Sequence, residues 1–211
     1  MRTRLAAALM MLALSTLTVA CLGKVKYPTY YTLDLPSAPD PPVQVGARPT
    51  VAVRGFRSPD YLRQDAIVYR PSPEQIGFYN YQHWAVNPSE FVTRAMMDRL
   101  RASGKFGGVT MYDGRADVDF VVTGRLEKLD EIDYQGGVNA EVALSAQMTD
   151  FRSGKTVWAG DASQVDKVDQ RTVAGVVAAM TDALDGAIQK LLASLAVPVT
   201  NTEPLGDRAQ R

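Results

Sequence analysis

Cys21 is the residue best placed to carry chemistry, because it is the only cysteine in the 211-residue chain and follows an apolar segment. Arg2 and Arg4 give a basic start, and the apolar run 5–19 leads to the small residue Ala20. This order is typical of a secretory signal peptide. The run has about 15 residues, fewer than the ~20 that a membrane-spanning helix needs. The sequence therefore predicts a secretory signal that ends next to a thiol.

The five residues that end at this thiol, Leu-Thr-Val-Ala-Cys, resemble the lipobox of bacterial lipoproteins. The resemblance implies cleavage after Ala20 and covalent acyl chains such as palmitate on Cys21. One acyl chain holds a protein to a membrane only marginally, whereas several chains make the attachment effectively permanent. Leu22 takes the place where an inner-membrane retention signal would have Asp. We therefore expect a lipid anchor in the outer membrane, on the periplasmic face.

Other residue types that carry chemistry form no recognisable catalytic pattern. His83 is the only histidine, and a zinc site would need further ligands from carboxylates. A Ser-His-Asp arrangement is formally available, but the sequence has no Gly-x-Ser-x-Gly nucleophile elbow. Asp117 and Asp119 are spaced for paired acid–base work, although strand alternation explains them as a solvated face. The sequence therefore predicts no enzyme activity, no catalytic or metal-binding residues, and no cofactor other than the acyl chains on Cys21.

Length and charge favour one domain of ordinary size. The chain has 23 basic and 23 acidic side chains, and two of the basic ones lie in the signal peptide. The mature protein is therefore nearly neutral, which argues against a nucleic-acid partner. After the signal peptide, no apolar run is long enough to span a membrane. We expect a lipoprotein signal peptide over residues 1–20, a lipidated tether over 21–26, a single domain over 27–197 and a disordered tail over 198–211.

Hydrophobic periodicity predicts the secondary structure. A helix should begin at Asn87, whose side chain can accept from unpaired amides, with Pro88 at the first helical position. Alternating apolar residues over 117–129 and 138–149 predict long strands with one face in water. The full set of expected strands is 30–35, 50–56, 66–70, 75–81, 106–112, 117–129, 138–149 and 155–163, and the expected helices are 87–103 and 172–195.

The order of these elements is strands, helix, strands, helix, which is typical of an α+β domain. The long C-terminal helix carries an apolar stripe and should pack on one face of a sheet. We therefore predict an α+β fold, with a mainly antiparallel sheet, a C-terminal three-strand meander and two α-helices that cover the sheet.

One aromatic group near the middle of the chain has two interpretations. Its members are Tyr69, Phe78, Tyr79, Tyr81 and Trp84. Many amphipathic rings within a few residues can form a corner of the core. They can equally form a surface for a partner or for lipid, since Tyr and Trp suit interfaces. The sequence leaves both open, and we name the group as candidate partner-binding residues.

A series of short motifs follows the lipobox in a specific order. They are Tyr30-Tyr31-Thr32-Leu33, Val51-Ala52-Val53, Pro59-x-Tyr61-Leu62, Ile67-Val68-Tyr69-Arg70, Trp84-x-x-x-Pro88 and a final long helix. Over about residues 21–195 the chain thereby resembles the ABC-type transport auxiliary lipoprotein family, which includes the paraquat-inducible protein C lipoproteins.

The resemblance implies a role and a set of partners. It implies an outer-membrane lipoprotein that works with an ABC permease, its ATPase and a protein with an MCE domain, and that docks a conduit for phospholipids or other hydrophobic molecules. ATP hydrolysis would belong to the partner, and no catalytic residues are implied. Whether the protein acts as one copy or as a homo-oligomer stays open.

Two other functions remain as alternatives. One is a structural or assembly lipoprotein of the cell envelope that is unconnected with transport. The other is a periplasmic hydrolase that uses His83, which would lose its activity on His83→Ala.

Overall fold

The computed structural model describes residues 25–39, 47–115, 117–134 and 136–197. The predicted signal peptide, with Ala20 and Cys21, and the predicted tail over 198–211 lie outside these residues. The strands are β1 Thr29–Tyr31, β2 Thr50–Val53, β3 Ala66–Ser72, β4 Gln75–Trp84, β5 Gly108–Met111, β6 Phe120–Ile132, β7 Asn139–Asp150 and β8 Thr156–Lys167. The helices are α2 Pro88–Ala102 and α3 Val173–Ala193, and a 3₁₀ turn, η2, spans Asp60–Leu62.

The eight strands form one mixed sheet in which β6 is the central element. On one side β6 pairs with β7, and β7 pairs with β8, all antiparallel and in chain order. Its other side carries β2 at the start and β3 at the end, both parallel to it. The pairs β1 with β4 and β2 with β5 are also parallel, whereas β3 and β4 are antiparallel. The prediction of a mainly antiparallel sheet was therefore wrong, while the α+β class with two helices is confirmed.

The two parallel pairs that involve β6 arise because the chain runs twice along the same edge of this strand. β2 pairs with residues 120–122, and β3 pairs with residues 131 and 132 further along. Between them, Arg57 forms an isolated parallel bridge with Arg125. The chain therefore keeps one direction from β2 to β3 and cannot turn back as a hairpin would. Alternation predicts which side chains face a core, but it does not predict the direction of neighbouring strands.

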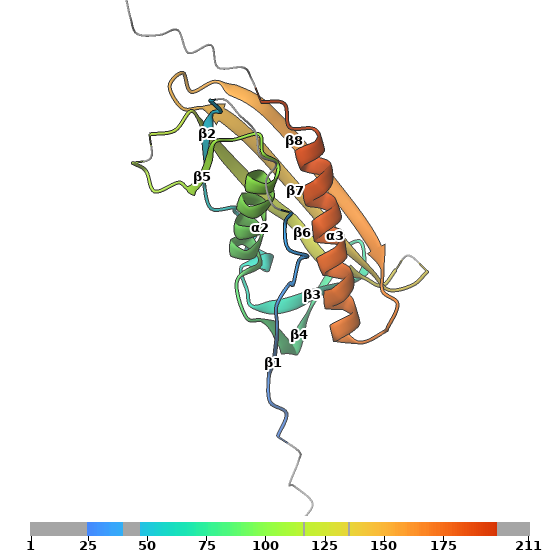
Figure 1. Cartoon of the computed structure of the whole chain (residues 1–211). Coiled ribbons are helices and arrows are strands. Elements are labelled where there is room, and N and C mark those ends of the chain that lie inside the picture. The colour runs from blue at the N-terminus through green and yellow to red at the C-terminus, as the bar shows by residue number, and fades with distance from the viewer. Residues whose placement is uncertain (1–24, 40–46, 116, 135, 198–211) are drawn as a thin grey trace, which may run out of the picture.

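Both helices lie on the same face of the sheet (Figure 1). α3 packs across β7 and β8, and α2 lies over β5 and the start of β6. α2 begins as predicted, because the Asn87 side chain accepts a 3.0 Å hydrogen bond from the Ser89 amide. An ion pair between Arg99 and Asp185, 2.6 Å apart and mostly buried, joins the two helices. The opposite face of the sheet carries no helix within the described residues.

The core lies between the helices and the sheet. On β7, which packs against α3, every second side chain from Ala140 to Met148 is buried. On β6, Phe120, Val122 and Leu126 are buried as well. A bulge between Leu126 and Lys128 then shifts the alternation, so that Leu129 faces the core. No helix within the described ranges is long and apolar enough to cross a bilayer.

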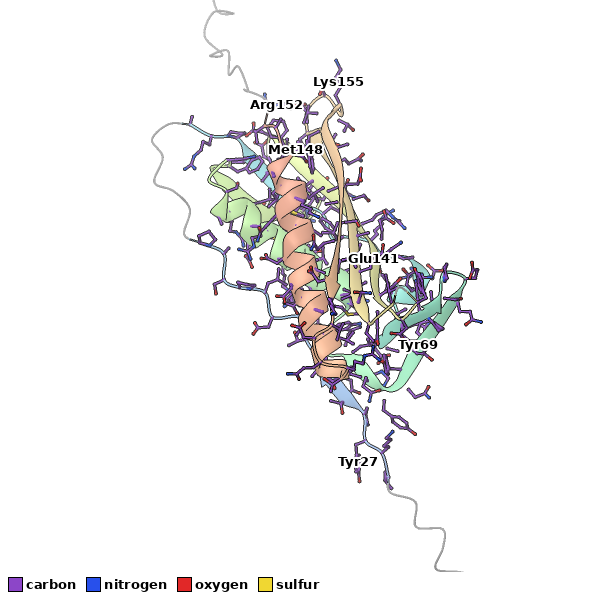
Figure 2. All side chains as sticks on the ribbon, turned by 90° about the vertical axis from the view of Figure 1, so that its right-hand side faces the viewer. Tyr27, Tyr69, Glu141, Met148, Arg152 and Lys155 are labelled. Atoms are coloured by element: carbon purple, nitrogen blue, oxygen red, sulfur yellow. The ribbon has the colours of Figure 1, made fainter. Side chains whose placement is uncertain are left out.

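The molecule is elongated, and the first described residues lie at one end of it. Figure 2 shows Tyr27 at this end, with Arg152 and Lys155 of the β7–β8 turn at the other. Residues 25–30 are all exposed, while Leu33 is buried against the core. The chain therefore enters the domain from one end.

Candidate functional site

The aromatic group predicted from the sequence lies on the β3–β4 hairpin, where it splits into a buried and an exposed part. Trp84 is only 4% exposed and belongs to the core, and Phe78 packs against the same core. The rings of Tyr69 and Tyr79 lie 5.2 Å apart between their centroids, and both are half-buried. Tyr81 is 40% exposed. The structure therefore brings Tyr69 and Tyr79 together and leaves Tyr81 as the ring of this group with the largest exposed surface.

Beneath this hairpin lies a polar cluster that the sequence analysis missed. Asp130 is 0% exposed and Glu131 is 4% exposed, although both are acidic residues in the middle of a sheet. Arg70 Nε lies 2.5 Å from Asp130 Oδ2, and the Tyr79 hydroxyl donates a 2.9 Å hydrogen bond to Glu131 Oε2. The Arg70 guanidinium also lies 5.5 Å from the centre of the Tyr61 ring. Together these contacts fasten the hairpin to β6.

Burial governs the protonation of this cluster. It raises the pKa of the Glu131 carboxyl to about 7, and the hydrogen bond from Tyr79 opposes part of the shift. It also raises the pKa of the Asp130 carboxyl, against the hydrogen bond and the charge of Arg70. Burial and then the charge of Asp130 raise the pKa of Tyr61 to about 12. The cluster is therefore a structural ion pair beside a carboxyl that changes its charge near neutral pH.

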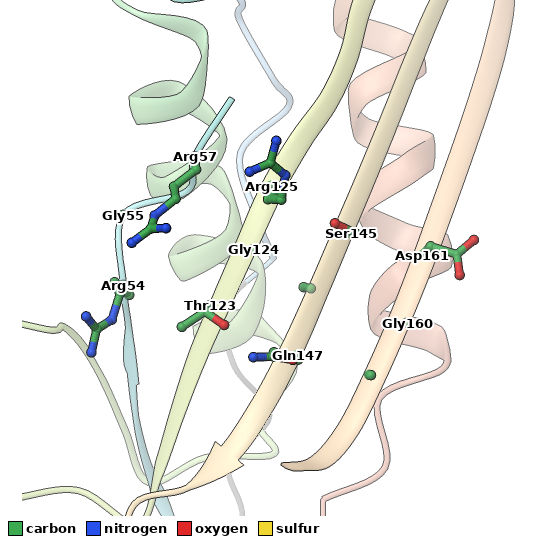
Figure 3. A pocket seen from close by; sticks show the side chains of 12 residues that line it. Arg54, Gly55, Arg57, Thr123, Gly124, Arg125, Ser145, Gln147, Gly160 and Asp161 are labelled. Atoms are coloured by element: carbon green, nitrogen blue, oxygen red, sulfur yellow. The ribbon is translucent and has the colours of Figure 1, made fainter. Parts of the chain in front are cut away.

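A groove on the helix-free face of the sheet is the second candidate site. Its volume is about 690 Å³, and its walls come from the segment after β2 and from β6, β7 and β8. Figure 3 looks onto this face, with the helices behind the strands. The polar side chains in its lining are Arg54, Arg57, Thr123, Arg125, Ser145, Gln147 and Asp161. The sequence carries no motif that marks this set in advance.

His83 is the histidine that the sequence analysis considered for a zinc site or a Ser-His-Asp arrangement. His83 lies beside the exposed carboxylate of Asp65, with Nδ1 and Oδ1 3.3 Å apart, and its ring contacts the ring of Tyr30. Among the described residues, no three side chains of the kinds that ligate metals gather into one group. The prediction that the chain needs no cofactor beyond acyl chains on Cys21 stays a prediction.

These observations define a one-sheet α+β domain with one face covered by helices and one face open. The chain belongs to the ABC-type transport auxiliary lipoprotein component family, whose family model matches residues 31–191. The match lies within the domain that we predicted over 27–197 and confirms the resemblance to this family. Membership of a lipoprotein family indicates attachment to the cell envelope, and the family's description indicates association with ABC transport.

Solved structures support the fold. Protein XCC0632 from Xanthomonas campestris, described as a DUF330 family protein, superposes with a TM-score of 0.66 at 18% identity, over 78% of this chain and 92% of that one. An uncharacterised protein superposes with a TM-score of 0.61 at 16% identity, over 79% and 95%. At such low identities the likeness concerns the fold alone. A comparison with curated proteins gave no match.

Proposed function

We propose that this chain is the outer-membrane lipoprotein of an ABC/MCE-type transport system that moves phospholipids or other hydrophobic molecules between the two membranes. It acts as a docking subunit, and the energy comes from ATP hydrolysis by its partner. The observation that carries this proposal is the family match, which spans residues 31–191 and hence nearly the whole described domain.

The position of the first described residues supports an anchor at Cys21. Tyr27 follows Cys21 by six positions, and an extended chain of that length spans at most about 20 Å. Residues 25–30 are exposed and lie at one end of the molecule (Figure 1). An acylated Cys21 would therefore hold the β1 end of the domain near the membrane, with the β7–β8 turn farther away in the periplasm.

The β3–β4 hairpin supports a docking role. Tyr81 and Ile76 are 40% and 38% exposed on β4, so this hairpin presents two large side chains with apolar surface to water. Behind them, Tyr69 and Tyr79 pack against each other, while Phe78 and Trp84 fix the strand to the core. An exposed amphipathic ring on a strand that is held by the core suits a protein interface. We place the MCE partner on this surface.

Site-specific photo-cross-linking tests this placement in the native envelope. A cross-linking amino acid replaces Tyr81 in one chain and Lys155, at the opposite end of the domain (Figure 2), in the control. We expect an MCE-domain protein to be cross-linked from position 81 and not from position 155. Recovery of assembly or cell-wall proteins in its place would favour the structural lipoprotein, and absence of any MCE protein from both positions would contradict the proposal.

A further inference from the structure

The groove on the open face has the position and size of a ligand site. It lies where β6, β7 and β8 present the side chains that point away from α2 and α3 (Figure 3). Its volume of about 690 Å³ falls in the range of about 300–1,000 Å³ that is common for small-molecule sites. The open face is therefore hollowed rather than flat at this point.

The backbones of two arginines that line the groove are paired on neighbouring segments. Arg57 and Arg125 are bridge partners, because the Arg57 amide donates to the Gly124 carbonyl at 3.0 Å and the Arg57 carbonyl accepts from the Leu126 amide at 2.8 Å. Bridge partners direct their side chains to the same face of a sheet. Like charges at such positions destabilise the pair unless something neutralises them. Directly paired like charges are normally avoided in a sheet, and exceptions to such rules are typical of functional sites.

Side chains of the described residues provide only some of the hydrogen bonds and ion pairs that these guanidinium groups can form. Arg125 Nε lies 3.2 Å from Glu127 Oε1, and the same carboxylate oxygen accepts a 2.7 Å hydrogen bond from the Ser145 hydroxyl. The Arg57 guanidinium has no side-chain hydrogen bond or ion pair to any described residue. The Arg54 guanidinium stacks on the Tyr112 ring at 4.4 Å, and no carboxylate pairs with it in the described part of the chain. Several guanidinium N–H groups therefore have no protein partner among the described residues and could bind a ligand.

The lining contains three guanidinium groups and one carboxylate, that of Asp161 on β8. Ser145 on β7 lies between Arg125 and Asp161 in the strand register, and Thr123 and Gln147 form the next cross-strand pair beside them. Guanidinium forks match the oxygens of a phosphate group in geometry and in charge. The arginine side of the groove therefore suits a phosphate, and the chain offers hydroxyl and amide groups beside it.

We propose that this groove binds the phosphate of an anionic phospholipid headgroup, with Arg57 and Arg125 as its main ligands and Arg54 beside them. The choice of a phospholipid over other phosphates rests on the proposed transport function. The lipid phosphate lies between the two cross-strand arginines and neutralises them, and the acyl chains extend out of the groove.

Binding of defined probes to the purified full-length mature lipoprotein in detergent tests the proposal. The probes are dihexanoyl phosphatidylglycerol, dihexanoyl glycerol without phosphate, and inorganic phosphate, each followed by titration calorimetry. We expect saturable binding of the phosphatidylglycerol alone. Binding should weaken at least about tenfold in Arg57→Gln/Arg125→Gln, because two charge-assisted contacts are lost. The matched control Arg152→Gln, in the exposed β7–β8 turn, should bind as the wild type does.

Each other result overturns the proposal. Equal binding of dihexanoyl glycerol would mean an apolar-chain site, and equal binding of inorganic phosphate would mean a site for free phosphate. Equal loss in Arg152→Gln would mean non-specific electrostatic attraction. Absence of binding to the wild type would mean no headgroup site. If the double variant has a lower unfolding midpoint than the wild type, the binding test uses Arg57→Gln alone. The Arg57 side chain has no partner to lose among the described residues, so this single variant should keep the wild-type stability.

The cross-linking at position 81 separates this inference from the proposed function. A wild type that binds phosphatidylglycerol but cross-links no MCE protein would retain the headgroup site and refute the transport role. A double variant that loses the lipid but still cross-links the MCE protein would show that the groove acts on cargo and not on docking.

Discussion

Glu131 is a residue whose charge should change with the pH of the surroundings near neutrality. It is buried on β6 and accepts a hydrogen bond from the Tyr79 hydroxyl of the hairpin. Its pKa is raised to about 7 from an ordinary value of 4.5, with burial as the main cause. The folded state therefore binds more protons than the unfolded state between these two pH values, and the fold is favoured by acid over this window.

The first prediction concerns this pH dependence. Because the folded pKa is the higher one, the stabilisation from protonated Glu131 is fully present below pH 4.5 and is lost as the pH rises through about 7. Glu131→Gln keeps an acceptor for Tyr79 and cannot ionise, so it should be more stable than the wild type at pH 8, by about 2 kcal/mol, and nearly equal at pH 5. Urea unfolding at both pH values measures this, with Glu74→Gln in the exposed hairpin turn as the control. Equal stabilities of Glu131→Gln and the wild type at pH 8 would contradict the assignment.

The second prediction concerns the ion pair of Arg70 and Asp130. Arg70→Met leaves a carboxyl that is 0% exposed without its partner, and should cost about 3–5 kcal/mol in free energy of unfolding. Arg70→Met/Asp130→Leu removes both charges and should cost much less. Arg63→Met, which removes a cation from an exposed pair, should change stability by less than about 0.5 kcal/mol. A double variant as unstable as Arg70→Met would show that the ion pair is not what holds the hairpin.

At the scale of secondary-structure elements, β6 positions both candidate sites. Its first half carries the arginine groove, and its second half carries the buried acidic residues under the hairpin. The close packing at Gly124 fixes the first half, because a Cβ atom there would lie 2.3 Å from Cε1 of the Phe56 ring. Phe56 and Gly124 face the core, so their neighbours Arg57 and Arg125 point to the open face.

The third prediction tests this packing. Gly124→Ala should destabilise the domain by about 1–3 kcal/mol, since the methyl group overlaps the Phe56 ring in a closely packed core. Gly137→Ala is the matched control, because a Cβ atom there meets nothing within 4 Å. Thermal or urea unfolding measures both. Phe56→Leu in the Gly124→Ala background should recover part of the loss, and equal effects of the two glycine substitutions would contradict the packing argument.

The sequence predicts some elements well because their signals are local. Asn87 and Pro88 are helix-start signals that depend only on neighbouring residues, and the apolar alternation of β7 needs only one buried face. The direction of β2 and β3 beside β6 is not local, since it depends on where the chain returns to the sheet. The burial of Asp130 and Glu131 was missed for a related reason. A bulge after Leu126 shifts the alternation, and the partner Arg70 lies 60 residues away.

At the candidate sites, too, the sequence predicts what local signals encode and misses what depends on distant parts of the chain. The sequence identified the aromatic residues of the hairpin, but it did not distinguish buried Trp84 from exposed Tyr81, because both occur on one amphipathic strand. The arginine groove has no sequence motif at all. Its residues come from four chain segments, and only the strand register brings Arg57 beside Arg125.

On the scale of the whole molecule, the proposed function assigns different tasks to different regions of the domain. The first described residues lead from one end towards the predicted anchor, the hairpin offers an aromatic surface, and the open face carries the arginine groove (Figures 1 and 3). The helix-covered face supplies the core that holds these regions in fixed positions. The docking role that we propose needs this rigidity, because such a subunit would have to hold a membrane and a partner at once.

The central claim is that this domain works from a lipid anchor at Cys21 in the outer membrane. Intact mass and membrane fractionation of the protein from its own envelope test it most directly, with Cys21→Ser as the comparison. We expect a wild-type mass that matches cleavage after Ala20 plus acyl chains, and outer-membrane fractionation that is lost in the variant. A wild-type protein that is soluble and carries no acyl chain would contradict the account.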